Sequence, residues 1–234
     1  MTVTGHVIHG RHRAPTGGST RRPAAGRRRR VVRRGLDLLV ATSALLLLAV
    51  PMLVVALLVR ATSPGPALFR QVRVGEHRRP FGMLKFRTMQ LDCSDDLHRA
   101  YVTRELHGEG LAGENGVHKL DADPRVTRLG RVLRRTSIDE LPQLINVLRG
   151  EMSLVGPRPM LPWECDLLRP DHRDRFSVPA GMTGLWQVSG RSALSMTEAL
   201  DLDVHYARHA GLLVDLAILV RTVWVVLVPR GRAQ

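Results

Sequence analysis

Two adjacent carboxylates, Asp139 and Glu140, lie in a segment whose residue types suit group transfer. Basic residues flank the pair on both sides: Arg131, Arg134, Arg135, Arg149 and Arg158. Guanidinium groups bind diphosphate oxygens, carboxylates hold Mg²⁺, and a carboxylate can itself attack phosphorus. The segment therefore fits a metal-assisted phosphoryl-transfer site.

The same two acids also mark the beginning of a predicted helix. Four apolar residues recur at the spacing of one helix face: Leu141, Leu144, Ile145 and Leu148. Gly150 predicts the helix end, Ser137 with Glu140 fits a capping box, and Pro142 suits a first turn. Either Ser137 or Asp139 could be the N-cap. A helix start favours an ionised Asp139, available as nucleophile or ligand; the alternative is an ordinary helix start with two acids.

The sequence excludes several other kinds of catalytic, metal-binding and nucleic-acid-binding site. The sequence has no GxxxxGK[ST], GxSxG or HExxH motif. Its two cysteines, Cys93 and Cys165, exclude a disulfide framework and a four-cysteine zinc site. The histidines lack metal-ligand spacing and are predicted to lie on the surface. An aromatic content of 4% excludes a base-stacking platform.

An uncharged stretch of 22 residues, 38–59, predicts a membrane helix. As a helix it is about 33 Å long, enough for the hydrocarbon core. Pro51 near its middle predicts a kink or break. Basic residues dominate both flanks, whereas a spanning helix has one strongly basic side. Two topologies remain open from these features: a kinked spanning helix, or a re-entrant helix that bends at Pro51 and returns to the same face.

The charge of the chain is concentrated at its beginning. The 234 residues hold 35 Lys and Arg against 21 Asp and Glu, a net charge of +14. Residues 1–34 contain ten arginines and no acid, so the rest of the chain carries only +4. This Arg-rich tail, whose composition predicts disorder, could bind nucleic acid, attract anionic lipid at about 1 kcal/mol per basic residue, or remain solvated.

The rest of the chain reads as one domain of mixed elements. Residues 67–74 and 81–89 predict a hairpin, and 90–123 predict a helix with a variable loop. Residues 212–228 predict a helix with an apolar stripe formed by Leu216, Val220, Val223, Trp224 and Leu227. That helix suits either the membrane interface, with Trp224 at headgroup depth, or the core.

Five blocks, in order, resemble the bacterial sugar transferase family. They are SPGPALFRQVRVG (63–75), KFRTM (85–89), RRTSIDELPQLINVLRGEMSLVGPRP (134–159), TGLWQVSGRS (183–192) and LDLDVHY (200–206). The similarity covers roughly residues 33–229 and is to the short form of the monotopic polyprenyl-phosphate phosphoglycosyl transferases. It implies a mainly α, α/β monotopic membrane protein. Its parts would be a re-entrant helix-break-helix, a small cytosolic catalytic domain and interfacial amphipathic helices.

The resemblance also implies a reaction and a set of site residues. A sugar-1-phosphate would pass from a nucleoside diphosphate sugar, expected to be a UDP-sugar, to polyprenyl (undecaprenyl) phosphate, as the first membrane step of exopolysaccharide or other glycoconjugate assembly. Asp139 would attack phosphorus through a covalent aspartyl intermediate, and Glu140 with Asp139 would hold Mg²⁺. The implied phosphate, diphosphate or nucleotide contacts are Lys85, Arg87, Arg134, Pro157, Arg158, Pro159, Arg191 and Asp203.

The implied organisation divides the chain into four parts. These are a disordered tail (1–32), a re-entrant helix (33–60), a catalytic domain (61–229) and a short tail (230–234). The expected location is the cytoplasmic face of the bacterial cell membrane, with anionic lipid and downstream glycosyltransferases as partners and no nucleic acid. In this family a serine usually precedes the proline of the membrane helix, whereas here Val50 precedes Pro51. The stretch 90–123 is also longer than the corresponding stretch in the smallest members of the family. The alternative function is a membrane-tethered nucleic-acid-binding protein.

Overall fold

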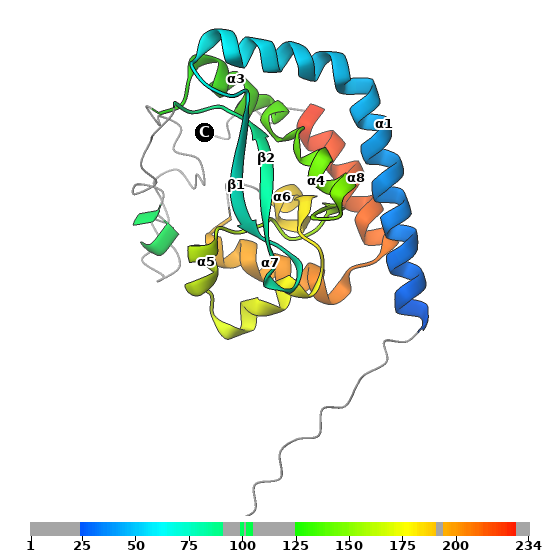
Figure 1. The fold of residues 1–234 in the computed structure, drawn as a ribbon. Coiled ribbons are helices and arrows are strands. Elements are labelled where there is room, and N and C mark those ends of the chain that lie inside the picture. The colour runs from blue at the N-terminus through cyan, green and yellow to red at the C-terminus, as the bar shows by residue number, and fades with distance from the viewer. Residues whose placement is uncertain (1–23, 91–98, 101, 105–124, 191–193, 228–234) are drawn as a thin grey trace, which may run out of the picture.

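A long helix, α1 (Ala24–Thr62), runs alongside a domain of short helices and two small sheets (Figure 1). The computed structural model describes residues 24–90, 99–100, 102–104, 125–190 and 194–227. The elements after α1 are β1 (Leu68–Val74), η1 (Glu76–Arg78), β2 (Pro80–Phe86), α3 (Arg128–Thr136), η2 (Ile138–Glu140), α4 (Gln143–Arg149), β3 (Ser153–Val155), α5 (Pro162–Asp166), η3 (Pro170–Ser177), β4 (Gly181–Thr183), α6 (Leu185–Ser189), α7 (Met196–His209) and α8 (Leu212–Leu227). Helices predominate, as the predicted fold class requires.

Helix α1 is continuous through Pro51 and bent. Its first part runs along one side of the domain, and its last part turns across the end (Figure 1). A proline inside a helix removes one backbone hydrogen bond and ordinarily bends the helix. The predicted helix-break-helix is therefore a bend in one helix, and whether that helix is re-entrant stays a prediction.

The helix begins at Ala24, nine residues earlier than the predicted boundary at residue 33. Residues 24–32 belong to the tail whose composition predicts disorder, and that prediction is wrong for them. Arginine is a good helix former, and the following turn of α1 is bonded to the domain by Arg33 and Arg34. The remainder of the Arg-rich tail, residues 1–23, lies outside the described residues.

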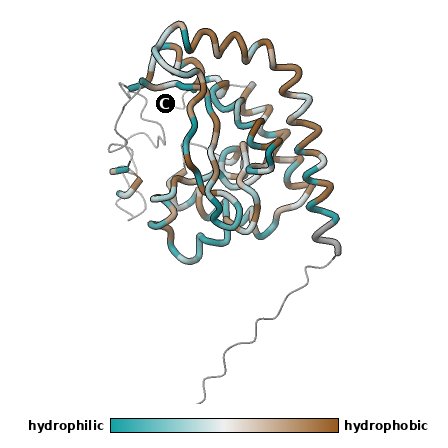
Figure 2. Tube along the Cα trace, viewed as in Figure 1, coloured by the Kyte–Doolittle hydropathy of each residue, from teal (hydrophilic) through white to brown (hydrophobic). Residues whose placement is uncertain are grey.

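The second half of α1 exposes many large apolar side chains. They include Leu46, Leu47, Val50, Leu53, Val54, Leu57 and Leu58, with Leu47 80% exposed. Figure 2 shows the resulting hydrophobic band along the helix. Residues 28–62 form a helix long and apolar enough to cross a membrane by length and composition. A continuous apolar surface of this kind is unfavourable in water and supports membrane association.

Two short sheets position the segments that matter for the site. β1 and β2 pair antiparallel with Phe69 opposite Lys85, which confirms the predicted hairpin. β3 and β4 pair in parallel, with Ser153 opposite Gly181. A side chain at Gly181 would come within 2.0 Å of the backbone nitrogen of Gly156, so only glycine allows this approach.

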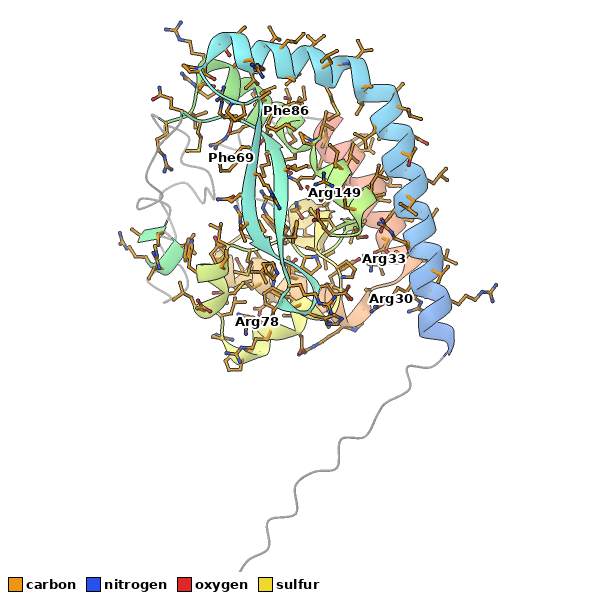
Figure 3. All side chains as sticks on the ribbon, in the orientation of Figure 1. Arg30, Arg33, Phe69, Arg78, Phe86 and Arg149 are labelled. Carbon is orange, nitrogen blue, oxygen red and sulfur yellow. The ribbon has the colours of Figure 1, made fainter. Side chains whose placement is uncertain are left out.

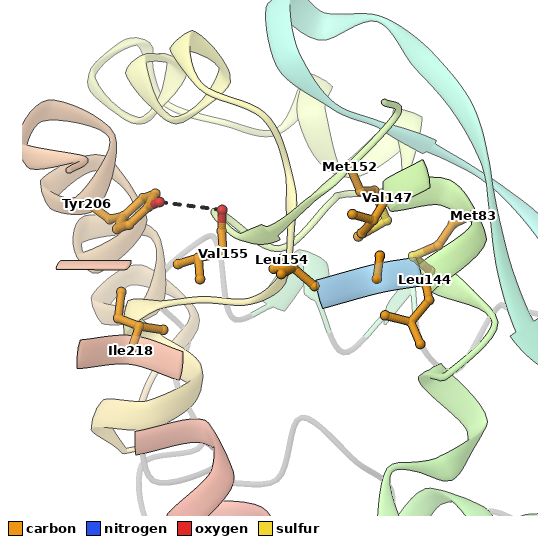
Figure 4. Packing of buried hydrophobic residues seen from close by; sticks show 9 residues of the cluster. Met83, Leu144, Val147, Met152, Leu154, Val155, Tyr206 and Ile218 are labelled. Carbon is orange, nitrogen blue, oxygen red and sulfur yellow. Dashed lines mark hydrogen bonds between the residues drawn. The ribbon is translucent and has the colours of Figure 1, made fainter. Parts of the chain in front are cut away.

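One cluster of buried residues joins α1 to the rest of the domain (Figure 4). It contains Ala41, Met83, Leu144, Val147, Met152, Leu154, Val155, Tyr206 and Ile218. These residues come from α1, β2, α4, β3, α7 and α8 and from the turn before β3. The N-terminal half of α1 is therefore part of the hydrophobic core of the domain.

The predicted capping box at Ser137 is wrong. Ser137 has a left-handed backbone (φ 59°), and its N–H donates to the carbonyl of Arg134, which ends α3. Asp139 and Glu140 follow in the 3₁₀ turn η2, and α4 begins after Pro142 with no side-chain cap. The acids therefore lie between two helices, not in the first turn of α4. Gly150, with φ 78°, does end α4 as predicted.

Helix α8 has one face packed in the core and one exposed apolar face, and its place at a membrane interface stays a prediction. Ile218 is buried in the core cluster, whereas an apolar stripe remains exposed, comprising Leu213, Leu216, Val220, Val223 and Trp224. The side chain of Leu227 lies outside the described residues. An exposed apolar stripe beside a core-packed face is typical of a helix at a membrane interface.

Candidate functional site

Three separate segments meet at the carboxylate of Glu140. Its Oε1 accepts a hydrogen bond from Nζ of Lys85 at 3.1 Å and from Nη2 of Arg158 at 3.0 Å. Lys85 lies on β2, Glu140 on η2, and Arg158 in the loop that follows β3. Both bonds join full charges at partly buried positions, where such bonds are strong.

The charges at the site support one another. Burial alone would raise the pKa of Glu140, but Arg158 and Lys85 together hold that pKa well below its usual range. Burial lowers the pKa of Lys85, and the charge of Glu140 opposes this shift. Glu140 also raises the pKa of Arg158, which keeps the guanidinium charged. Glu140 is therefore ionised throughout the physiological pH range.

Asp139 is the second carboxylate of the site and is 7% exposed. It lies on η2 directly before Glu140. Its charge partly opposes the lowering of the Lys85 pKa by burial, and it adds to the effect of Glu140 that raises the pKa of Arg158. The structure thus brings together Lys85, Asp139, Glu140 and Arg158, as predicted. Two carboxylates beside two fixed cations can bind a phosphorylated ligand and attack it.

The segment Pro157-Arg158-Pro159 is held by backbone contacts from two sides. The carbonyl of Pro157 accepts a hydrogen bond from the N–H of Gly181 at 2.9 Å. The carbonyl of Pro159 accepts one from Nη1 of Arg73 at 3.3 Å. Because both prolines also restrict the backbone, Arg158 is presented to Glu140 from a rigid loop.

Asp203 does not face the acidic pair directly. It is 2% exposed, and its Oδ2 accepts a hydrogen bond from Nη2 of Arg175 at 2.5 Å. The same nitrogen donates to the backbone carbonyl of Arg158 at 2.7 Å. Asp203, predicted as a substrate contact, therefore positions Arg175, which in turn bonds to the backbone of Arg158. No motif identifies Arg175 from the sequence. The only signal available is that a buried Asp203 would require a cationic partner.

The side chains of Arg134 and Arg87 bond to two different parts of the fold. Arg134, in the last turn of α3, donates from Nε to Oγ1 of Thr88 at 2.9 Å. Arg87 is buried and donates to the carbonyls of Ser63, at 2.8 Å, and Pro64 at the end of α1. Its predicted role as a substrate contact is not supported, because its donors hold the end of the membrane helix. Arg191 lies outside the described residues.

No group of three or more potential metal ligands occurs among the described residues. Asp139 and Glu140 remain as two adjacent carboxylates. The prediction that all histidines lie on the surface is wrong for His172, which is 3% exposed and has its Nε2 2.9 Å from Oδ1 of Asp201.

Comparisons with known proteins agree on one family. A sequence model described as bacterial sugar transferase matches residues 28–229. The exopolysaccharide production protein ExoY of Sinorhizobium fredii is 38% identical over 210 residues, which cover 90% of each chain. The UDP-glucose:undecaprenyl-phosphate glucose-1-phosphate transferase of Caulobacter vibrioides is 40% identical over 199 residues, covering 82% of this chain and 68% of that protein.

Some relatives are longer proteins. The undecaprenyl-phosphate galactose phosphotransferase of Salmonella typhimurium is 37% identical over 203 residues, which cover 87% of this chain but 42% of that protein. The chain thus spans less than half the length of this relative.

The position of Arg87 predicts a loss of stability on its removal. Arg87→Ala removes a buried guanidinium and leaves the partly buried carbonyls of Ser63 and Pro64, directly after α1, without this donor, so we expect the free energy of unfolding to fall by about 2–4 kcal/mol. The measurement is the melting temperature in nanodiscs. Arg131→Ala, which changes an exposed side chain, is the control. An unchanged melting temperature in Arg87→Ala would contradict the assignment.

The burial of Asp203 predicts a pH dependence. Burial raises its pKa from 3.8 to about 6, against the opposing effect of Arg175. The folded state therefore holds this proton more tightly, so the stability of the wild type relative to Asp203→Asn falls as pH rises from 4 to 6, by up to about 3 kcal/mol. Melting temperatures of both proteins across that range test this. A difference that stays constant with pH would exclude the titration.

Proposed function

The chain belongs to the bacterial sugar transferase family, and on that basis we propose that it transfers a sugar-1-phosphate from a nucleoside diphosphate sugar to polyprenyl phosphate. The proposed donor is a UDP-sugar, the acceptor is undecaprenyl phosphate, and the product starts the assembly of an exopolysaccharide or related glycoconjugate. Names of relatives support this, since the Caulobacter protein is named for UDP-glucose and the Salmonella protein for galactose.

One observation carries the proposal: buried Asp139 and its partly buried neighbour Glu140 meet two cations from distant segments. Lys85 and Arg158 both bond to Oε1 of Glu140, so their charges are held beside Asp139. A diphosphate brings several negative oxygens, which need fixed cations, and its phosphorus needs a nucleophile close by. The site offers both within one 3₁₀ turn and its neighbours.

The reaction would proceed in two displacements at one phosphorus. The carboxylate of Asp139 attacks the phosphorus that carries the sugar, and an Asp–O–P bond forms while the bond to the nucleoside monophosphate breaks. The leaving phosphate takes the electron pair. An oxygen of polyprenyl phosphate then attacks the same phosphorus, and the Asp139 carboxylate is released unchanged. Arg158, Lys85 and Arg134 would neutralise the phosphate oxygens during both steps.

The carboxylates fit a divalent cation. Mg²⁺ uses oxygen ligands and is commonly held by one or two carboxylates together with substrate phosphates, so a cluster of three acids is not required. Asp139 and Glu140 would hold it. Bound there, Mg²⁺ would draw electron density from the diphosphate and so ease the departure of the nucleoside monophosphate.

Two apolar surfaces support a location at the membrane. We propose that α1 enters the membrane as a re-entrant helix and that the exposed stripe of α8 lies at the cytoplasmic interface. The bend of α1 and the exposed residues of both helices support this arrangement (Figures 1 and 2). A site on the cytoplasmic face would meet a soluble nucleotide sugar and a lipid phosphate together.

Replacement of the nucleophile gives the sharpest test of the proposal. Asp139→Asn should abolish UMP release from UDP-glucose or UDP-galactose in the presence of undecaprenyl phosphate and Mg²⁺, because an amide cannot form the phosphoryl intermediate. We expect at least a thousandfold loss of turnover.

Asp171→Asn is the matched control, because it removes an exposed carboxylate on η3 and should retain wild-type turnover. Undiminished UMP release by Asp139→Asn would overturn the mechanism.

The re-entrant topology predicts that both ends of α1 lie on one side of the membrane. Single cysteines at Arg29 and Ala61, in a chain with Cys93 and Cys165 replaced by alanine, should both resist an impermeant maleimide in intact spheroplasts. Both should react after permeabilisation. Labelling of one cysteine alone in intact spheroplasts would establish a spanning helix instead.

A further inference from the structure

We infer that Arg33, Arg34 and Asp37, on the N-terminal half of α1, are positioning residues that hold the two segments carrying the reacting groups. Together they form what we call the α1 clamp. This inference rests on the proposed function for its activity readouts. It gives the membrane helix a role in arranging the site in addition to anchoring the enzyme.

Asp37 and Arg33 hold β3. Oδ1 of Asp37, a 6% exposed residue, accepts hydrogen bonds from the backbone N–H of Leu154 at 3.0 Å and from Oγ of Ser153 at 3.1 Å. Nη2 of Arg33 donates to the carbonyl of Val155. Every residue of β3 is therefore bonded to a charged side chain of α1.

Arg34 holds the end of α4. Its Nη1 donates to the carbonyl of Val147 at 2.5 Å, and its Nη2 donates to the carbonyl of Leu148 at 2.8 Å. These carbonyls belong to the last turn of α4, where the helix dipole favours a cation and backbone acceptors lack partners. Arg33 and Arg34, which are adjacent on α1, thus bond to two different segments, β3 and α4.

The two held segments are those that carry the site. β3 leads within three residues into Arg158, and α4 follows Glu140 after two intervening residues. A shift of either segment against the other changes the bond between Nη2 of Arg158 and Oε1 of Glu140, which is 3.0 Å. The α1 clamp therefore sets the geometry of the cation and carboxylate pair from outside the site.

A buried network secures the clamp on the far side. Nε of Arg33 lies 3.1 Å from Oδ2 of Asp215 on α8, and Tyr206 on α7 donates to Oδ1 of Asp215 at 2.6 Å. Figure 3 shows Arg33 on the domain side of α1, and Figure 4 shows Tyr206 beside Val155. Charges in such a setting are costly to leave unpaired, so this network specifies one position of α1.

The test compares substitutions at Asp37 with a control on the same helix. Asp37→Ala removes the acceptor for Ser153 and Leu154, whereas Asp37→Asn keeps an oxygen that can accept both bonds. Arg29→Ala removes an exposed charge of α1 that could only attract lipid. All variants are measured in nanodiscs by UMP release from UDP-glucose and UDP-galactose with undecaprenyl phosphate.

We expect Asp37→Ala to lower kcat at least tenfold with less than a threefold change in donor KM, and Asp37→Asn and Arg29→Ala to stay within threefold of wild type. A double-mutant cycle separates positioning from general destabilisation. In an Arg158→Lys background, where the bond to Glu140 is already altered, Asp37→Ala should cost less than threefold more. An equal loss in both backgrounds, or no loss in either, would overturn the inference.

Hydrogen exchange tests the clamp without any turnover. Asp37→Ala should speed amide exchange at residues 153–156 and 158 at least tenfold while β1 (Leu68–Val74) keeps its protection; unchanged exchange at these residues would contradict the clamp. Absence of UMP release by the wild type would refute the proposed function alone, because the exchange result would still decide the structural claim.

Discussion

The rest of the site depends on one interaction. The carboxylate of Glu140 accepts hydrogen bonds from both the ammonium of Lys85 and the guanidinium of Arg158. A carboxylate removed in part from water needs a charged partner, and here the pairing occurs where β2, η2 and the loop after β3 meet. The hydrophobic core, the close approach of Gly156 to Gly181 and the support of Arg175 beneath Arg158 all serve that meeting. Asp139 gains its fixed electrostatic surroundings from the same arrangement.

The membrane helix belongs to this arrangement as well. Its second half presents apolar side chains outward, while its first half contributes Ala41 to the core and charged side chains to β3 and α4. The proposed transfer of a sugar phosphate from a soluble donor to a lipid phosphate requires that the reacting atoms stay at a fixed depth relative to the bilayer. A helix that is both embedded and bonded to the site-bearing segments provides that relation directly.

Much of this could be predicted from sequence where the signal is local. Two strand-like runs, 67–74 and 81–89, joined by a turn-prone segment predicted the hairpin, and Gly150 predicted the end of α4. The failures concern one local backbone geometry and several partners distant in the chain. Ser137 ends α3 instead of capping α4, because its backbone is left-handed and its N–H bonds to the carbonyl of Arg134. Arg87 bonds to Ser63 and Pro64, and these partners are set by the tertiary fold and not by a local motif. His172 and Arg175 lie on the irregular segment η3 and are buried by contacts with α7. The spacing of apolar residues in the sequence does not predict these contacts.

The central claim is that Asp139 carries the sugar phosphate between donor and acceptor. Intact-mass spectrometry of the protein, incubated with UDP-sugar and Mg²⁺ but without polyprenyl phosphate, tests it most directly. We predict a mass gain equal to one sugar phosphate, located by peptide mapping to the segment containing Asp139 and discharged when undecaprenyl phosphate is added. A protein that releases UMP in the complete reaction but never gains this mass, or gains it at another residue, would contradict the account.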